Sequence, residues 1–296
     1  MNHMTPEVIC IGQAVIDCIT REMDRAPFSE GKARARSITL NAGGDAMNES
    51  CVLAGMGRRA ELVCGTGDDF AGQYLLDQAR QKGVGTDRAQ VVPGMQTPVA
   101  NMFVAADGSR SSVSSLATLL EGYIPDPGDL RGVKVMSLAS LFRAPLDQAE
   151  IVCGLVRAAH AAGAVVCADC KLPTFRQLKL EELEEVLPMI DYFFPNETEA
   201  AYYSGKEDLF DMGETLLQRG FRHVIIKAGE RGCLVFGDGK PYELPAIEVP
   251  VVDTTGAGDN FVAGFIDGLL RGLAVKECCR AGLEQAALSV QHVGAT

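Results

Sequence analysis

Short apolar runs alternate along this chain with segments of helical period, and this alternation restricts the fold more than any other feature. The apolar runs, each short enough for a buried strand, are Val8–Ile11, Glu61–Cys64, Val133–Leu138, Ala164–Cys167, Tyr192–Phe194 and Val224–Ile226. The helical segments between them include Ala46–Met56, Gly72–Lys82, Leu146–Ala162 and Leu180–Leu187. The pattern predicts an α/β protein with a mainly parallel central sheet between two layers of helices.

Two stretches interrupt this rhythm and predict antiparallel strands. Val15–Thr39 has a polar centre with Pro and Gly, flanked by alternating residues. Val99–Ala105 and Arg110–Ser115 flank a turn at Asp107-Gly108, which is typical of a β-hairpin. We expect a small accessory sheet that covers the carboxyl ends of the parallel strands, where α/β proteins bind ligands. Decoration of the sheet edge is the alternative.

Composition excludes several classes of protein. There are 27 Lys and Arg against 39 Asp and Glu, a net charge of −12, which argues against a surface for nucleic acid or anionic membrane. No apolar run is long enough to span a bilayer, and residues 1–11 do not resemble a signal peptide. We therefore expect a cytoplasmic protein. Its ten cysteines, including the CxxC pair Cys167 and Cys170, are interpreted as reduced core thiols, with a metal or redox site as the alternative.

The strongest local signal is the segment Asp253–Phe265, which reads DTTGAGDNFVAGF. Apolar residues after Asp259 recur with helical period, so Gly256-Ala257-Gly258 is predicted to be a tight turn that enters a helix. Backbone N–H groups and the positive end of the helix would form an anion site there.

Asp259 lies in the first turn of that predicted helix, beside the expected anion. A carboxylate is repelled by a bound phosphate unless it has a chemical task, such as accepting the proton of a hydroxyl that attacks phosphorus. The alternative is an ordinary helix-capping Asp. We predict a catalytic base, because capping alone does not require the preceding Gly-Ala-Gly.

Three motifs together resemble those of the ribokinase-like (PfkB-type) carbohydrate kinases. Asp253–Asp259 resembles their C-terminal signature. Asn41–Asn48, followed by a helix that ends at Gly55–Gly57, resembles their N-terminal signature. Pro195–Glu199 matches their Asn-x-x-Glu motif. The motifs occur in the family order and spacing. The resemblance implies an α/β/α core (1–12, 42–96 and 116–296) and a β-lid over the sugar site (13–41 and 97–115).

The resemblance also implies the roles of residues on the nucleotide side. ATP would bind near Asn196, Lys227, Gly229 and Gly258, and Glu199 would hold Mg²⁺ through water, an arrangement that suits an ion that keeps its hydration shell. Read without the resemblance, Asn196 and Glu199 could cap a helix and Lys227 could form a surface ion pair.

On the acceptor side, the resemblance implies that Asp17 and Asn48 bind sugar hydroxyls, while Gly43 and Gly44 let the backbone approach the sugar. Asp17 and Asn48, taken singly, could equally be turn or cap residues.

A monovalent cation site, such as one for K⁺, is implied near the adenine side. Its residues would be Asp253, Thr255, Ser289 and Gly294. Pairing of lids in the family makes a homodimer the expected assembly.

The chain departs from ribokinases at several positions. Asp45 stands where ribokinases carry Lys, and Ala139 where they carry a sugar-binding Glu. The Asp-x-Asn-x-Arg stretch of related sugar kinases is present only as Asp169-Cys-Lys171. We therefore predict ATP- and Mg²⁺-dependent phosphorylation of a hydroxyl on a small sugar or related polyol. The alternatives are a nucleoside kinase of the same fold and a catalytically silent sugar- or nucleotide-binding protein.

Overall fold

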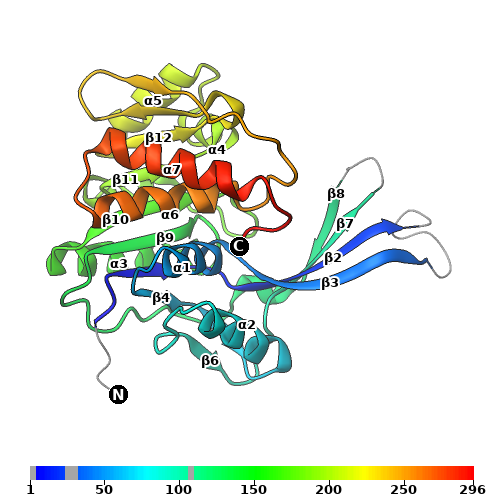
Figure 1. Ribbon diagram of the computed structural model, residues 1–296. Helices are drawn as coiled ribbons and strands as arrows, with labels where there is room; N and C mark the ends of the chain where they lie inside the picture. Colours follow the sequence, from blue (N-terminus) through cyan, green and yellow to red (C-terminus); the bar gives the residue numbers. More distant parts are fainter. Residues whose placement is uncertain (1–4, 24–32, 106–109) are drawn as a thin grey trace.

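A central eight-stranded sheet organises the protein, whose computed structural model describes residues 5–23, 33–105 and 110–296. The strand order is β14-β13-β12-β11-β10-β9-β1-β4 (Figure 1). All neighbours from β12 to β4 pair in parallel, and β13 and β14 add an antiparallel edge. The strands are β1 (Val8–Ile11), β4 (Ala60–Val63), β9 (Val135–Leu141), β10 (Val165–Cys170), β11 (Tyr192–Phe194), β12 (Val224–Lys227), β13 (Cys233–Phe236) and β14 (Tyr242–Leu244). The predicted, mainly parallel sheet is confirmed.

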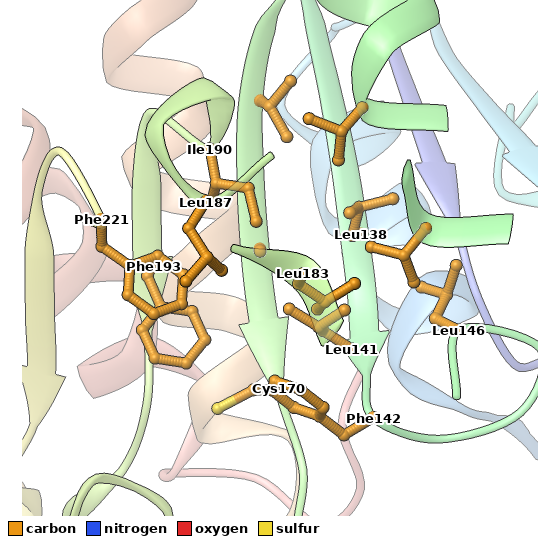
Figure 2. Packing of buried hydrophobic residues seen from close by; sticks show 14 of the residues in the cluster. Leu138, Leu141, Phe142, Leu146, Cys170, Leu183, Leu187, Ile190, Phe193 and Phe221 are labelled. Carbon is orange, nitrogen blue, oxygen red and sulfur yellow. The ribbon is translucent and has the colours of Figure 1, made fainter. Parts of the chain in front are cut away.

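Helices cover both faces of the sheet because its central strands are apolar on both sides. In β1, Val8 and Cys10 belong to one hydrophobic cluster, and Ile9 and Ile11 to another, as the alternation of a strand requires. The first cluster packs under α1 (Asp45–Gly55), α2 (Phe70–Gln81), α6 (Ala257–Leu270) and α7 (Val275–Ser289). The second packs under α3 (Ala149–Ala162), α4 (Glu197–Ser204) and α5 (Leu209–Gln218), and Figure 2 shows part of it.

One predicted helix is wrong. Residues 180–187 form two short 3-10 turns, η2 (Leu180–Leu183) and η3 (Leu187–Met189), instead of an α-helix. Pro188 explains the difference, because proline lacks the N–H of a helix interior and disfavours helical geometry in the residue before it. Leu180, Leu183 and Leu187 are nevertheless buried against the second cluster.

The two irregular stretches join in one four-stranded sheet, which we call the lid sheet. Its order is β3-β2-β7-β8, and it projects from the core (Figure 1). The strands are β2 (Val15–Met23), β3 (Ala35–Gly43), β7 (Val99–Val104) and β8 (Arg110–Ser114). β2 runs antiparallel to β3 and parallel to β7, and β7 and β8 are antiparallel. The predicted turn at Asp107-Gly108 lies outside the described residues, and the exact lid boundaries stay a prediction.

The remaining elements are short. β5 (Gly65–Gly67) and β6 (Gln90–Val92) form a two-stranded sheet, and η1 (Leu116–Leu119) and η4 (Gly229–Arg231) are 3-10 turns. Within the described ranges, none of the helices combines the length and apolar character needed to cross a membrane. Cys167 and Cys170 are free thiols buried in β10.

Candidate active site

A cavity of about 560 Å³ opens where the parallel strands end. Most of the residues predicted from the sequence line it: Asp17, Gly44, Asn48, Asn196, Lys227, Gly229, Thr255, Gly256, Ala257, Gly258 and Asp259. The predicted residues outside its lining are Gly43, Glu199, Asp253, Ser289 and Gly294. The fold therefore unites the acceptor-side and nucleotide-side motifs in one space.

The Gly-Ala-Gly turn at the start of α6 has the geometry expected of an anion site. Gly256 precedes the helix with φ of +75°, a conformation that favours glycine. The N–H groups of Gly258 and Asp259 donate to no acceptor in the described part of the chain. Unpaired N–H groups at a positive helix end suit phosphate oxygens. Such an arrangement can stabilise charge that develops on a transferred phosphoryl group.

Asp259 is 4% exposed and does not cap the helix. Its Oδ2 accepts a hydrogen bond of 2.7 Å from Asn48 Nδ2, so the capping alternative is wrong. Burial, followed by the nearby charge of Asp45, raises the pKa of Asp259 to about 7, although Lys171 and Asn48 oppose the shift. A carboxylate with this pKa is poised to take a proton at neutral pH.

Lys171 is a site residue that the sequence motifs did not identify. Its Nζ lies 3.4 Å from Asp45 Oδ1 and 4.0 Å from Asp259 Oδ1. The Ser140 hydroxyl donates to Asp45 Oδ2 over 2.8 Å. Asp45 above all, with Asp259, raises the pKa of Lys171 despite burial. The position of Lys171 directly after β10 was the available signal, because residues there face the ligand edge of the sheet.

Lys227 is held in the cavity by a buried carboxylate. Lys227 Nζ lies 2.6 Å from Asp169 Oδ1, and the side chain of Asp169 is fully buried, so the surface-pair alternative is wrong. Burial is the largest influence and lowers the pKa of Lys227, but Asp169 and Glu199 together outweigh it, so the pKa of Lys227 is raised. A Cβ on Gly258 would lie 3.2 Å from Lys227 Nζ, so this ammonium stands beside the anion turn.

Asn196 and Glu199 form a capping box at the start of α4. Asn196 Oδ1 accepts from the Glu199 N–H over 2.9 Å, and Glu199 Oε2 accepts from the Asn196 N–H over 2.8 Å. The capping alternative is therefore confirmed, and only Asn196 lines the cavity. The Cys170 thiol also donates to Glu199 Oε2, over 3.7 Å. Burial and then Asp169 raise the pKa of Glu199.

The same region offers oxygen atoms that suit Mg²⁺. Asp169 Oδ2 is buried and has no hydrogen-bond partner among the described residues. Among those residues, however, no three His, Cys, Asp or Glu side chains gather as a closed metal site. A hydrated Mg²⁺, bound through one or two carboxylates and substrate phosphates, fits this set of ligands.

Asp17 points into the acceptor half of the cavity from β2, opposite Asn41 in β3. Gly43 provides the space for it, because a Cβ at Gly43 would overlap Asp17 Oδ2. Burial and the charge of Asp45 raise the pKa of Asp17 to about 6. A carboxylate in this position can accept hydrogen bonds from two hydroxyl groups.

The predicted cation loop is partly assembled. Asp253 Oδ1 accepts from the Thr255 N–H over 3.0 Å and from its hydroxyl over 2.7 Å, and Asp253 Oδ2 accepts from the Gly294 N–H over 3.3 Å. The Ser289 hydroxyl instead donates to Ala286 O within α7. Asp253, Thr255 and Gly294 therefore come together, and the cation itself stays a prediction.

The chain is similar to known proteins over nearly its whole length. Residues 5–296 match the family model described as pfkB family carbohydrate kinase. A cytidine kinase of Thermococcus kodakarensis is 31% identical over 287 residues, which cover 95% of this chain and 94% of that protein. An ATP-dependent ribose-1-phosphate kinase of Halopiger xanaduensis is 30% identical over 249 residues, which cover 84% of this chain and 80% of that protein.

A solved structure extends the match to three dimensions. Ribokinase of Arabidopsis thaliana, complexed with ribose and ATP, superimposes with a TM-score of 0.85 at 27% identity and covers 99% of this chain and 95% of that one. The chain therefore belongs to the pfkB family of carbohydrate kinases, and it is a phosphotransferase with an alcohol group as acceptor.

Proposed function

We propose that the protein transfers the γ-phosphoryl group of ATP to a hydroxyl of a small sugar or related polyol. The observation that carries this proposal is the position of Asp259. Its buried carboxylate adjoins the free N–H groups of the anion turn and lies in the same cavity as Asp17 and Asn48. Transfer of a phosphoryl group to a hydroxyl uses such a pair, because the anion site holds the transferred group while the base accepts the proton of the hydroxyl.

In the proposed reaction, the acceptor oxygen attacks the γ-phosphorus while its proton passes to Asp259. The bond from the γ-phosphorus to the bridging oxygen breaks, and ADP leaves with the electron pair. The N–H groups of Gly258 and Asp259 receive charge on the transferred group, and Lys227 neutralises phosphate charge beside them. Positioning and charge neutralisation would supply most of the rate enhancement.

Glu199, acting through water, would hold Mg²⁺, which supplies further charge neutralisation on the phosphates when it is bound. The loop of Asp253, Thr255 and Gly294 would take K⁺, and loss of activity on exchange of K⁺ for a large organic cation would test that assignment. Asp17 and Asn48 would orient the acceptor hydroxyls.

A nucleoside acceptor is the second candidate, because the relative from Thermococcus kodakarensis is a cytidine kinase. The test is a panel of sugars, sugar phosphates and nucleosides, assayed for ADP release with ATP and Mg²⁺. Turnover of sugars or polyols supports the proposal, and faster turnover of nucleosides favours the second candidate. Binding of acceptors with no turnover would instead indicate a silent binding protein.

We also propose that the protein is a cytoplasmic homodimer that pairs through the lid sheet. Ile38, Leu40 and Val113 are exposed on the lid strands, which supports burial of that sheet against a second copy. Sedimentation of the protein and of an Ile38→Ser, Leu40→Ser variant would test this: a dimer that becomes monomeric supports the proposal, and a monomeric unmodified protein contradicts it.

A further inference from the structure

Arg143 occupies a rigid position at the rim of β9. Phe142, the residue before it, has φ of +73°, a strained conformation for a bulky residue, and its ring stacks on Tyr203 with centroids 4.2 Å apart. The Arg143 N–H donates to Ser140 O over 2.9 Å, and its Nε donates to Leu172 O. The backbone turn and the Nε contact therefore fix the direction of the guanidinium, which lines the cavity.

Arg143 differs from the other cavity cations in having no carboxylate partner in the described part of the chain. Lys171 is balanced by Asp45 and Asp259, and Lys227 by Asp169. The two Nη groups of Arg143 are left without an acceptor among the described residues, while the side chain is half-buried. A planar fork of donors held in this way is suited to bidentate binding of a phosphate or carboxylate group.

The sheet order places Arg143 on the acceptor side of the cavity. Arg143 follows β9, which pairs with β1, the strand that leads into the lid strand carrying Asp17. On the nucleotide side, Asn196 follows β11 and Lys227 is the last residue of β12, and both strands lie beyond β10 on the other side. Ser140 connects Arg143 with Asp45 on the acceptor side. Its carbonyl accepts a hydrogen bond from the Arg143 N–H, and its hydroxyl donates to Asp45.

We infer that Arg143 binds an anionic group carried by the acceptor, so that the acceptor is a sugar phosphate or a sugar acid instead of a neutral sugar. This inference rests on the proposed function and narrows its substrate class. Asp17 and Asp45 disfavour an anion nearby, but Lys171 compensates Asp45, and the uncompensated guanidinium supplies the matching charge. Since no described residue accepts from the Nη groups of Arg143, an anionic ligand would supply the acceptors that residues 5–23, 33–105 and 110–296 do not.

The experiment compares matched acceptors and matched variants. The acceptors are ribose, ribose 1-phosphate, ribose 5-phosphate, ribonate and cytidine, with kcat/KM taken from ADP release at saturating ATP and Mg²⁺. The variants are Arg143→Met, Arg143→Lys and, as a control, Arg157→Met on the exposed face of α3. Thermal unfolding verifies that each variant folds. If Arg143→Met does not fold, Arg143→Lys still tests the inference.

We expect the wild-type protein to prefer one phosphate or carboxylate acceptor over ribose and cytidine by about 10²-fold or more. Arg143→Met should lower kcat/KM for that acceptor by a similar factor and leave the KM for ATP unchanged, because the anionic group of the acceptor loses its charged partner. Arg143→Lys should fall between the two, and Arg157→Met should match wild type. Comparison of the two ribose phosphates with ribonate identifies whether the anionic group of the acceptor is a phosphate or a carboxylate.

Three outcomes would overturn the inference. The first is that the wild-type protein prefers ribose or cytidine, and the second is that Arg143→Met lowers kcat/KM equally for all acceptors. The third is that Arg143→Met raises only the KM for ATP, which would assign Arg143 to the nucleotide. Calorimetric binding of ribose 5-phosphate, ribose 1-phosphate and ribonate, without ATP, separates this inference from the proposed function. Binding that Arg143→Met abolishes, without turnover, would retain the anion site while refuting the kinase proposal. Absence of any binding would refute the anion site.

Discussion

Asn48 Nδ2 donates a 2.7 Å hydrogen bond to Asp259 Oδ2 across 211 positions of sequence. The bond joins the first turns of α1 and α6, the two helices that carry the N-terminal and C-terminal signatures. It fixes the orientation of the proposed base and leaves its other oxygen, Oδ1, toward Lys171, 4.0 Å away. The N-terminal signature therefore positions the side chain of the proposed base, which belongs to the C-terminal signature, directly.

The pH dependence of turnover tests the role of Lys171. Because Lys171 lowers the pKa of Asp259 from the value that burial alone would produce, Lys171→Met should raise that pKa above about 7. The acid limb of the kcat/KM profile should then move to higher pH, and activity at pH 7 should fall several-fold. Lys171→Arg keeps the charge and should leave the limb close to that of wild type. An unmoved limb in Lys171→Met would contradict this electrostatic role.

Gly43→Ala tests the packing that positions Asp17. The new Cβ would overlap Asp17 Oδ2, so the carboxylate must move and the acceptor KM should rise by about tenfold or more. The KM for ATP should stay unchanged because the nucleotide side is separate. Gly55→Ala is the matched control, since a Cβ at Gly55 meets nothing within 4 Å. Equal acceptor KM values in the two variants would show that Gly43 has no such role.

Gly256→Ala tests the anion turn. Gly256 has φ of +75°, and its new Cβ would overlap Ala295. The turn should shift, which misplaces the N–H donors and lowers kcat by about 10²-fold. Gly272→Ala is the matched control, because Gly272 has nearly the same φ, +76°, but a Cβ there would meet open space. This variant should lose only about 1–2 kcal/mol of stability, and its kcat should stay close to that of wild type. Steady-state kinetics with thermal unfolding distinguishes the two effects, and similar kcat values would contradict the prediction.

The burial of Glu49 leads to a prediction of how the stability of the fold changes with pH. It is fully buried beside Ser137, whose hydroxyl donates to Glu49 Oε2 over 2.6 Å, and burial above all raises its pKa well beyond 4.5. A raised folded-state pKa contributes stability that is present below pH 4.5 and lost as pH rises through the folded-state pKa. Glu49→Gln should therefore gain in Tm over wild type as pH increases from 5 to 9. A pH-independent difference in Tm would contradict this, and Glu184→Gln on the exposed surface is the control.

The sheet was predictable because its strands are buried on both faces and read as continuous apolar runs, such as Val8–Ile11. The helix predicted at residues 180–187 failed because the leucine spacing suits helical and 3-10 turns alike, and Pro188 decides between them. The pairing of β2 with β7, which unites the two irregular stretches in the lid sheet, depends on contacts 83 residues apart (Ile16 with Val99) that local pattern does not encode.

In the site, the turn at Gly256 and the position of Asp259 in the first turn of α6 were predictable from the spacing of the motif, while the role of Asp259 as a base stays a prediction. Lys171 and Arg143 were not, because each is a single cation outside the three motifs, and only the fold shows that both reach the cavity. Likewise, the sequence offered helix capping as an alternative role for Asn196 and Glu199. Only the structure shows that the capping box uses Oε2 of Glu199.

The turnover of Asp259→Asn tests the central claim most directly. The substitution keeps the size of the side chain and an oxygen that can accept from Asn48, but removes the proton acceptor. We expect kcat to fall by about 10²–10⁴-fold while the KM for ATP and for the acceptor stay near wild type. Asp267→Asn, the same change in the same helix but outside the cavity, should keep its kcat. Near-normal turnover of Asp259→Asn, in protein that unfolds cooperatively, would contradict the assignment of Asp259 as the base.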